Sequence, residues 1–159
     1  VRPADPGYLP AVEKLQQAGE GAAHRPIPEL RLNALRVLLG AYQATRRHAE
    51  AIRCAKEALR VARDLRDEAT EALILDMAGD VRLAMGQTED ALRNYEQSLD
   101  LLQKLDHRWA ELVVKRDIGK LYQASGEWDK ARTWLHACLL EEERAGNVAH
   151  QARICYDLA

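Results

Sequence analysis

Two pairs of charged residues in this 159-residue sequence could bind charged groups of another molecule. Asp76 and Asp80 are four residues apart, and Arg116 and Lys120 repeat that spacing 40 residues later with the opposite sign. Residues four apart on an α-helix lie one turn apart on the same face. An acidic pair would then lie beside a basic pair. A partner that suits them would carry an acidic group over the basic pair and a basic or amide group over the acidic pair.

Residue types that support covalent or metal chemistry are present but are not arranged for it. The sequence contains no GxSxG, P-loop, GxGxxG or HExxH motif. The successive carboxylates at 141–143 point in different directions on a helix, so we expect a solvated face there. No HxxxH or mixed His/Cys spacing typical of zinc ligands occurs among His24, His48, His107, His136 and His150. We therefore expect no catalytic residues, no metal and no cofactor.

The three cysteines indicate a reducing compartment. Cys54, Cys138 and Cys155 are far apart, form no CxxC pair, and each falls on an apolar helical face. Buried free cysteines behave as small hydrophobic residues, and disulfides are rare in the cytosol. We expect three free thiols and a cytoplasmic protein.

The charge balance and the apolar runs exclude two classes of partner. There are 23 Lys and Arg residues against 25 Asp and Glu, a net charge of −2, whereas nucleic-acid-binding domains are usually strongly basic. No apolar run approaches the ~18 residues that suggest a membrane span. We expect neither nucleic acid nor a membrane as partner.

Helical periodicity and a 40-residue repeat organise most of the chain. Apolar or small residues at offsets 0, 1, 4, 7, 8 and 11 from Ala91 trace one helical face, and Ala51, Ala91 and Ala131 are spaced by 40. Short turns separate segments of about 17 residues, which must form antiparallel neighbours. The predicted helix pairs are 29–45 with 48–65, 68–85 with 88–105, and 108–125 with 128–145, followed by a further helix from about 148.

These pairs define the expected domains. Residues 1–28 are expected to be a loop that contains one helix. That helix is either the second helix of an earlier, degenerate repeat or a cap. The array covers 29–159, with repeats at about 29–67, 68–107 and 108–147 and a partial repeat at 148–159.

The order of small and large residues in the third pair resembles the tetratricopeptide repeat. Ile118-Gly119-x2-Tyr122 is followed by Ala131-x3-Leu135, which is similar to the L-G-x2-Y and A-x3-F signatures of that family. The second pair has Ala78-Gly79 and Ala91-x3-Tyr95, and the first keeps Leu38, Tyr42 and Ala51.

The sequence departs from the family in four ways. Arg82 replaces a tyrosine, Leu39 stands where glycine is expected, and the closing proline is replaced by Arg63, Gln103 and Glu143. The period is 40 instead of 34, which resembles the lengthened members of the family.

The resemblance implies a right-handed α-solenoid of antiparallel helix pairs, whose first helices line a concave, peptide-binding surface. On the matching positions, the expected peptide-binding residues are Arg36, Gln43, Asp76, Met77, Asp80, Arg116, Lys120 and Gln123. The charges alternate in sign, so the Lys/Asn carboxylate clamp of chaperone-binding members is not reproduced. Leu73, Met77 and Leu83 lie centrally, which favours a peptide with both apolar and charged groups.

Other interpretations of the same residues remain open. Arg36, Asp76 and Arg116 could instead pair with one another across adjacent repeats. The basic stripe Arg53, Lys56, Arg60 and Arg63 is expected to be a solvated outer face, and Trp109, Trp128 and Trp134 are expected to pack between repeats.

We expect a non-catalytic scaffold that binds a protein or peptide, with self-association through the ends of the array as a further interaction. The alternative is a regulatory or ligand-sensing arm of a larger multidomain enzyme or transcription activator.

Overall fold

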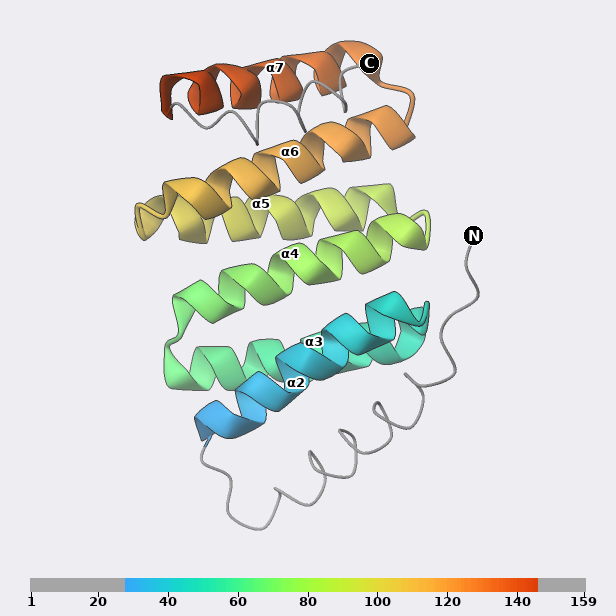
Figure 1. Cartoon of the computed structure of the whole chain (residues 1–159). Coiled ribbons are helices and arrows are strands. Elements are labelled where there is room, and N and C mark those ends of the chain that lie inside the picture. Colours follow the sequence, from blue (N-terminus) through green and yellow to red (C-terminus); the bar gives the residue numbers. More distant parts are fainter. Residues whose placement is uncertain (1–27, 146–159) are drawn as a thin grey trace.

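Six α-helices follow one another in antiparallel pairs (Figure 1). The computed structural model describes residues 28–145, with side chains as far as 143, and this part contains no strand. The helices are α2 (Pro28–Ala44), α3 (His48–Leu65), α4 (Glu68–Ala84), α5 (Thr88–Lys104), α6 (Arg108–Ala124) and α7 (Trp128–Ala145). Each predicted helix agrees with these bounds to within one residue. The helices expected near the N-terminus and from 148 lie outside the described residues.

The same turn ends five of the six helices and sets their lengths. A residue with left-handed backbone stands at every twentieth position, with φ between 52° and 75°: Arg46, Arg66, Gly86, Asp106 and Gly126. The following N–H group donates to a carbonyl five residues earlier, for example from Gln87 to Arg82 at 2.9 Å. This bonding satisfies the carbonyls that a helix end leaves unpaired. Because all turns are alike, α2, α4 and α6 begin 40 residues apart, at 28, 68 and 108.

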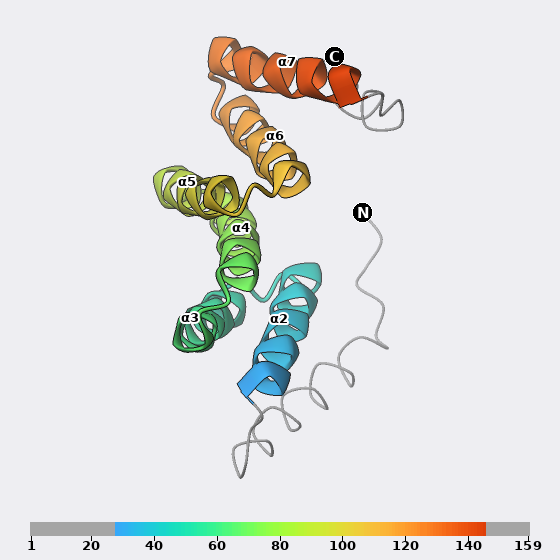
Figure 2. The same ribbon diagram turned by 90° about the vertical axis from the view of Figure 1, so that its left-hand side faces the viewer.

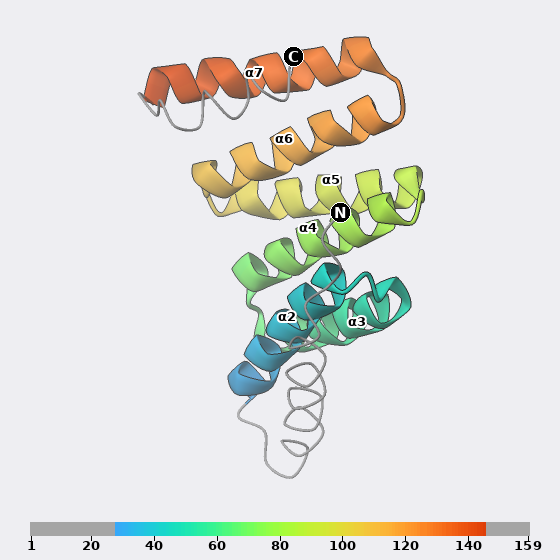
Figure 3. The ribbon, with the colours of Figure 1, turned by 45° about the vertical axis from the view of Figure 1, so that its right-hand side comes forward.

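The first helices of the three pairs form one layer of the stack. Helix α2 contacts α4, and α4 contacts α6, in addition to the contacts between consecutive helices. Figure 2 shows α2, α4 and α6 along one side and α3 and α5 along the other, and Figure 3 shows the stacking order from α2 to α7. The predicted right-handed α-solenoid of antiparallel helix pairs is confirmed.

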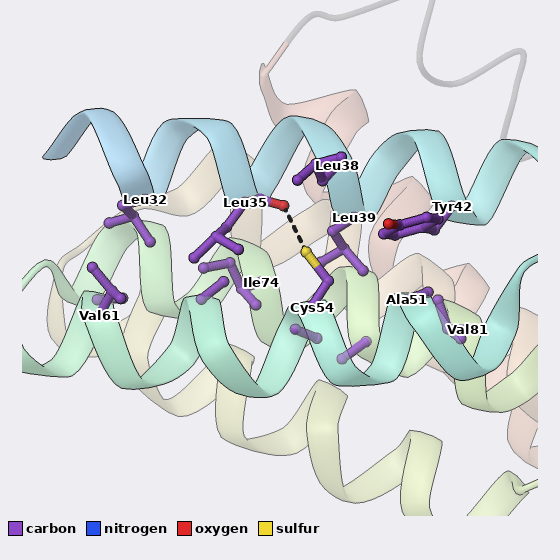
Figure 4. Packing of buried hydrophobic residues seen from close by; sticks show 14 residues of the cluster. Leu32, Leu35, Leu38, Leu39, Tyr42, Ala51, Cys54, Val61, Ile74 and Val81 are labelled. Atoms are coloured by element: carbon purple, nitrogen blue, oxygen red, sulfur yellow. Dashed lines mark hydrogen bonds between the residues drawn. The ribbon is translucent and has the colours of Figure 1, made fainter. Parts of the chain in front are cut away.

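Small residues let the paired helices approach each other. A Cβ atom added to Gly79 would lie 2.5 Å from the Tyr95 ring, and one added to Gly119 would lie 2.7 Å from Leu135. Tyr95 and Leu135 are fully buried, so each fills the space that its glycine leaves. In the first pair Leu39 of α2 occupies the corresponding position, where it lies close to Cys54 of α3 (Figure 4).

Polar atoms in this core bind backbone carbonyls of the first helices. The Ser98 hydroxyl donates to the Ala72 carbonyl at 2.7 Å. The equivalent pair of the next repeat, with both residue numbers 40 higher, is the Cys138 thiol and the Leu112 carbonyl, which are 3.9 Å apart. The Cys54 thiol donates to the Leu35 carbonyl at 3.2 Å (Figure 4). Buried hydroxyl and thiol groups are tolerated there because each has an acceptor.

The two thiols within the described residues are free and buried, as expected, while Cys155 lies outside them. Burial raises the pKa of Cys54 to about 12 and that of Cys138 to about 11. Since the thiolate is the nucleophile and a free cysteine has a pKa of about 8.5, both should react with iodoacetamide at pH 8 at least ~100-fold more slowly than in the unfolded chain. Peptide mass spectrometry with and without denaturant measures this. Complete labelling of the native protein within minutes would contradict the assigned burial.

Two expectations about side chains were wrong in part. Trp134 packs against the core, but Trp109 and Trp128 are 47% and 64% exposed, because each lies in the first turn of its helix, at the edge of the stack. Glu141 and Glu143 are exposed as expected, whereas Glu142 is buried. It lies one turn after Cys138, on the face of α7 that packs inward.

Candidate functional site

The surface formed by α2, α4 and α6, called the inner face below, carries large apolar side chains in contact with solvent. Val37 on α2 is 48% exposed and Leu73 on α4 is 41% exposed. Met77, Leu83 and Val113 are half-buried on the same helices. Residues three or four apart share a helix face, so Leu73, Met77 and the acidic residues of α4 belong to one surface.

Helices α2 and α4 are joined directly across this face. The Gln43 amide donates to the Met77 carbonyl at 3.1 Å. A Cβ atom at Gly40 would make an ordinary contact, 3.6 Å from the Met77 methyl group. Gln43 and Met77 therefore help to hold adjacent repeats together as well as lining the face.

A polar cluster spans α4 and α6, and Asp117 lies at its centre. The Lys120 ammonium is 3.1 Å from an Asp117 carboxylate oxygen, and Arg116 Nε is 3.7 Å from the same atom. The Arg116 side chain is only 12% exposed. Asp117 was not among the predicted site residues, although its i,i+3 spacing to Lys120 could have revealed the pair. Asp117 thus offsets part of the predicted basic step within its own helix, while Arg116 Nε is buried without a hydrogen-bond partner.

Asp76 lies beside this pair in a setting that disfavours negative charge. Its Oδ1 atom is buried and accepts no hydrogen bond. Burial, with Asp117 and Asp80 nearby, raises the pKa of Asp76 to about 7 against the opposing charges of Arg116 and Lys120. A buried acceptor without a donor is destabilising, and such groups concentrate at functional sites.

Asp80 is held by a buried phenol. The Tyr95 hydroxyl donates to Asp80 Oδ1 at 2.8 Å, and the ring that carries it packs on Gly79. Part of Asp80 is exposed, yet its carboxylate has Gln43 of α2, Tyr95 of α5 and Asp117 of α6 around it. Burial among these helices raises the pKa of Asp80, and the Tyr95 hydrogen bond opposes that shift. Tyr95 was assigned to the core from its sequence position, and its polar role was missed.

The remaining predicted residues lie on the same helices at either end of the cluster. Arg36 and Gln123 are half-buried on α2 and α6. Within residues 28–143, no ion pair shorter than 4 Å joins Arg36 to Asp76 or Asp76 to Arg116, so this part of the chain lacks the pairing considered as an alternative. The structure brings Gln43, Met77, Asp76, Asp80, Arg116 and Lys120 together.

The basic stripe on α3 lies in solvent. Arg53, Lys56, Arg60 and Arg63 are exposed, and two of them form ion pairs, Arg60 with Asp64 at 3.1 Å and Arg63 with Glu71 at 2.6 Å. Such exposed pairs contribute little to stability.

The part of the chain that the structure describes contains no group of three or more His, Cys, Asp or Glu side chains that could hold a metal ion. It also contains no helix that is long and apolar enough to cross a membrane.

Comparison with known families finds a match over part of the chain. Residues 30–104, from α2 to the end of α5, match the tetratricopeptide repeat family. No curated protein sequence matches the chain. The predicted resemblance to this family is confirmed, while assignment to its lengthened type stays a prediction.

Solved structures with the same fold cover nearly the whole chain. BtubC (BKLC) from P. vanneervenii superposes on this chain with a TM-score of 0.84 and a sequence identity of 18%. The match covers 96% of this chain and 64% of BtubC, so the chain spans less than two thirds of that protein's length. A putative kinesin light chain of Podospora anserina with nearly identical TPR-like repeats superposes with a TM-score of 0.78 and an identity of 19%. The match covers 95% of this chain and 75% of that protein. Aspartyl phosphate phosphatase F from Bacillus subtilis superposes with a TM-score of 0.80 and an identity of 16%. The match covers 92% of this chain and 39% of the phosphatase. At such identities these likenesses show the fold alone.

Proposed function

Because this chain carries tetratricopeptide repeats, we propose that it is a non-catalytic interaction module. It binds a peptide or an extended segment of a partner protein along the inner face. Repeats of this kind generally act in protein interaction. The proposal adds which face of this chain is used. It includes a cytoplasmic location, which the free thiols of Cys54 and Cys138 support.

One observation carries the proposal: exposed apolar side chains lie next to charged groups whose positions are fixed by the fold. Val37 and Leu73 offer apolar surface, and Asp80, held by Tyr95, lies on the same side of α4 as Leu73. A peptide presents apolar and charged groups at regular spacing. Because the surface is already ordered, the protein loses little conformational entropy when the peptide binds. The outer face of α3 has charge but no comparable apolar side chains.

A second candidate function is a regulatory arm of a larger multidomain enzyme or transcription activator. It is favoured by one observation, that solenoids of this fold form part of longer chains: the present chain spans 39% of phosphatase F and 42% of RapI. A catalytic or DNA-binding domain encoded next to this segment would support it.

The inner face is tested by capture of partner proteins on immobilised protein, with mass spectrometry as readout. The double variant Val37→Asp and Leu73→Asp places charge on apolar surface that is already exposed, so helicity measured by circular dichroism should not change. Proteins captured by the wild type should be lost.

The matched control is Arg53→Glu with Lys56→Glu on the outer face of α3, which should capture the same proteins as the wild type. If the control loses them and the inner-face variant retains them, the binding surface lies on α3 and the proposal is wrong.

A further inference from the structure

In the polar cluster that spans α4 and α6, carboxylates outnumber cations, and the carboxylates without an ion pair within 4 Å are on α4. Asp117 lies 3.1 Å from Lys120 and 3.7 Å from Arg116, so one carboxylate offsets one of the two positive charges on α6. Asp76 and Asp80 form no ion pair with any described residue. Three carboxylates of this cluster therefore face two cations. The two that form no ion pair within 4 Å lie one turn apart on α4, and the more distant charges of Arg116 and Lys120 offset them only in part.

Asp80 is the better placed of the two to meet a partner. Its Oδ1 atom accepts the Tyr95 hydroxyl at 2.8 Å, which fixes the carboxylate plane, and the residue is partly exposed on the inner face. Tyr95 itself is 0% exposed and cannot move away without opening the α4–α5 core. A carboxylate fixed in this way can accept a charge-assisted hydrogen bond with little loss of side-chain entropy.

The surroundings favour a cation on a long apolar stem. Leu73 lies on α4 about two turns, roughly 10 Å, before Asp80. Its exposed surface can cover the methylene groups of a lysine or arginine side chain that runs along α4. A positive charge would also offset the repulsion among Asp76, Asp80 and Asp117. An acidic group at the same place would add to that repulsion.

We infer that the partner presents a lysine or arginine side chain whose charged group binds the Asp80 carboxylate beside Asp76, with Tyr95 as the positioning residue and Leu73 as the apolar contact. This inference rests on the proposed function, because it assigns the chemistry of a ligand for the inner face. It also changes the emphasis of the expectation from the sequence, from an acidic group over α6 to a basic group over α4, because Asp117 already offsets part of the positive charge of α6.

The test uses a phage-displayed library of random 12-residue peptides selected on the full chain. Selected peptides should carry Lys or Arg at one fixed position, and replacing that residue by norleucine or citrulline, which keep the length and remove the charge, should weaken binding at least 10-fold. Asp80→Asn should cause a similar loss. Asp100→Asn, which changes an exposed carboxylate on α5, should leave binding unchanged.

Tyr95→Phe separates positioning from packing. It keeps the ring on Gly79 and removes only the hydroxyl. If Tyr95 positions Asp80, this variant should bind the arginine peptide more weakly while its affinity for the citrulline peptide changes little, so the ratio of the two affinities falls. A general loosening of the fold would weaken the binding of both peptides equally and leave the ratio unchanged.

The outcomes distinguish this inference from the proposed function. Peptides that lose binding to the Val37→Asp and Leu73→Asp variant but show no fixed basic residue overturn the inference and leave the proposed function standing. A library that yields no peptide dependent on the inner face overturns both.

Discussion

Asp76→Asn should stabilise the folded protein at pH 8 by about 1–3 kcal/mol, and the gain should disappear below about pH 4. Asp76 has its pKa raised from 3.8 to about 7 by burial and by the neighbouring carboxylates. Each pKa unit corresponds to about 1.4 kcal/mol, so roughly 4 kcal/mol is an upper limit that partial exposure reduces. Asparagine has nearly the shape of the protonated acid and never carries the charge.

The pH dependence has a definite sign. Between about pH 4 and 7 the native state keeps the Asp76 proton that the unfolded chain has released, so this residue makes stability fall as the pH rises. Denaturant unfolding of both proteins at pH 4, 6 and 8 gives the difference in the free energy of unfolding, in which other groups largely cancel. That difference should grow with pH.

The matched control is Asp117→Asn on the same face. It removes the partner of Lys120 and Arg116 and should therefore destabilise the protein at pH 8. If Asp76→Asn also destabilises it, or if its effect does not vary with pH, the strained setting assigned to Asp76 is incorrect.

Gly119→Ala should lower the stability by about 1–3 kcal/mol, the usual cost of overpacking a core. The added Cβ would lie 2.7 Å from Leu135 Cδ2 and 2.8 Å from its Cγ, and Leu135 is fully buried. Either the leucine leaves its rotamer or α6 and α7 move apart. Gly79→Ala should behave in the same way, against the Tyr95 ring.

Gly40→Ala is the control, because its Cβ would meet the Met77 methyl group at 3.6 Å, an ordinary contact. Alanine also favours the helix by up to about 1 kcal/mol, so this variant should be neutral or slightly stabilised. Thermal melting of the three variants measures the difference. Equal melting temperatures would show that the glycine position is not a contact between paired helices.

The helices could be predicted almost to the residue because each turn repeats at a fixed interval. Gly86 and Gly126 mark two of the turns in the sequence, and the 40-residue period extends them to Arg46, where the residue type gives no signal. The small residues at 79, 91, 119 and 131 identified the helix contacts, since side-chain volume alone decides how closely two helices approach.

The contacts within the candidate site could be predicted only in part. Helical periodicity placed Asp76, Asp80 and Lys120 on one face, but it does not specify which neighbours a long side chain reaches. The ion pair of Lys120 with Asp117 and the hydrogen bond from Tyr95 to Asp80 depend on side-chain rotamers and on the angle between helices. Burial of Glu142 similarly depends on how α7 rotates against its neighbours.

Photo-crosslinking measures most directly whether the inner face is the binding surface. The photoreactive residue p-benzoyl-phenylalanine replaces Leu73 on α4 in one protein and Lys56 on the outer face of α3 in another, and both side chains are exposed. On irradiation in a lysate of the source cells, position 73 should give a discrete adduct whose crosslinked segment contains a lysine or arginine, and position 56 should give none. Adducts from position 56 with none from position 73 would contradict the account.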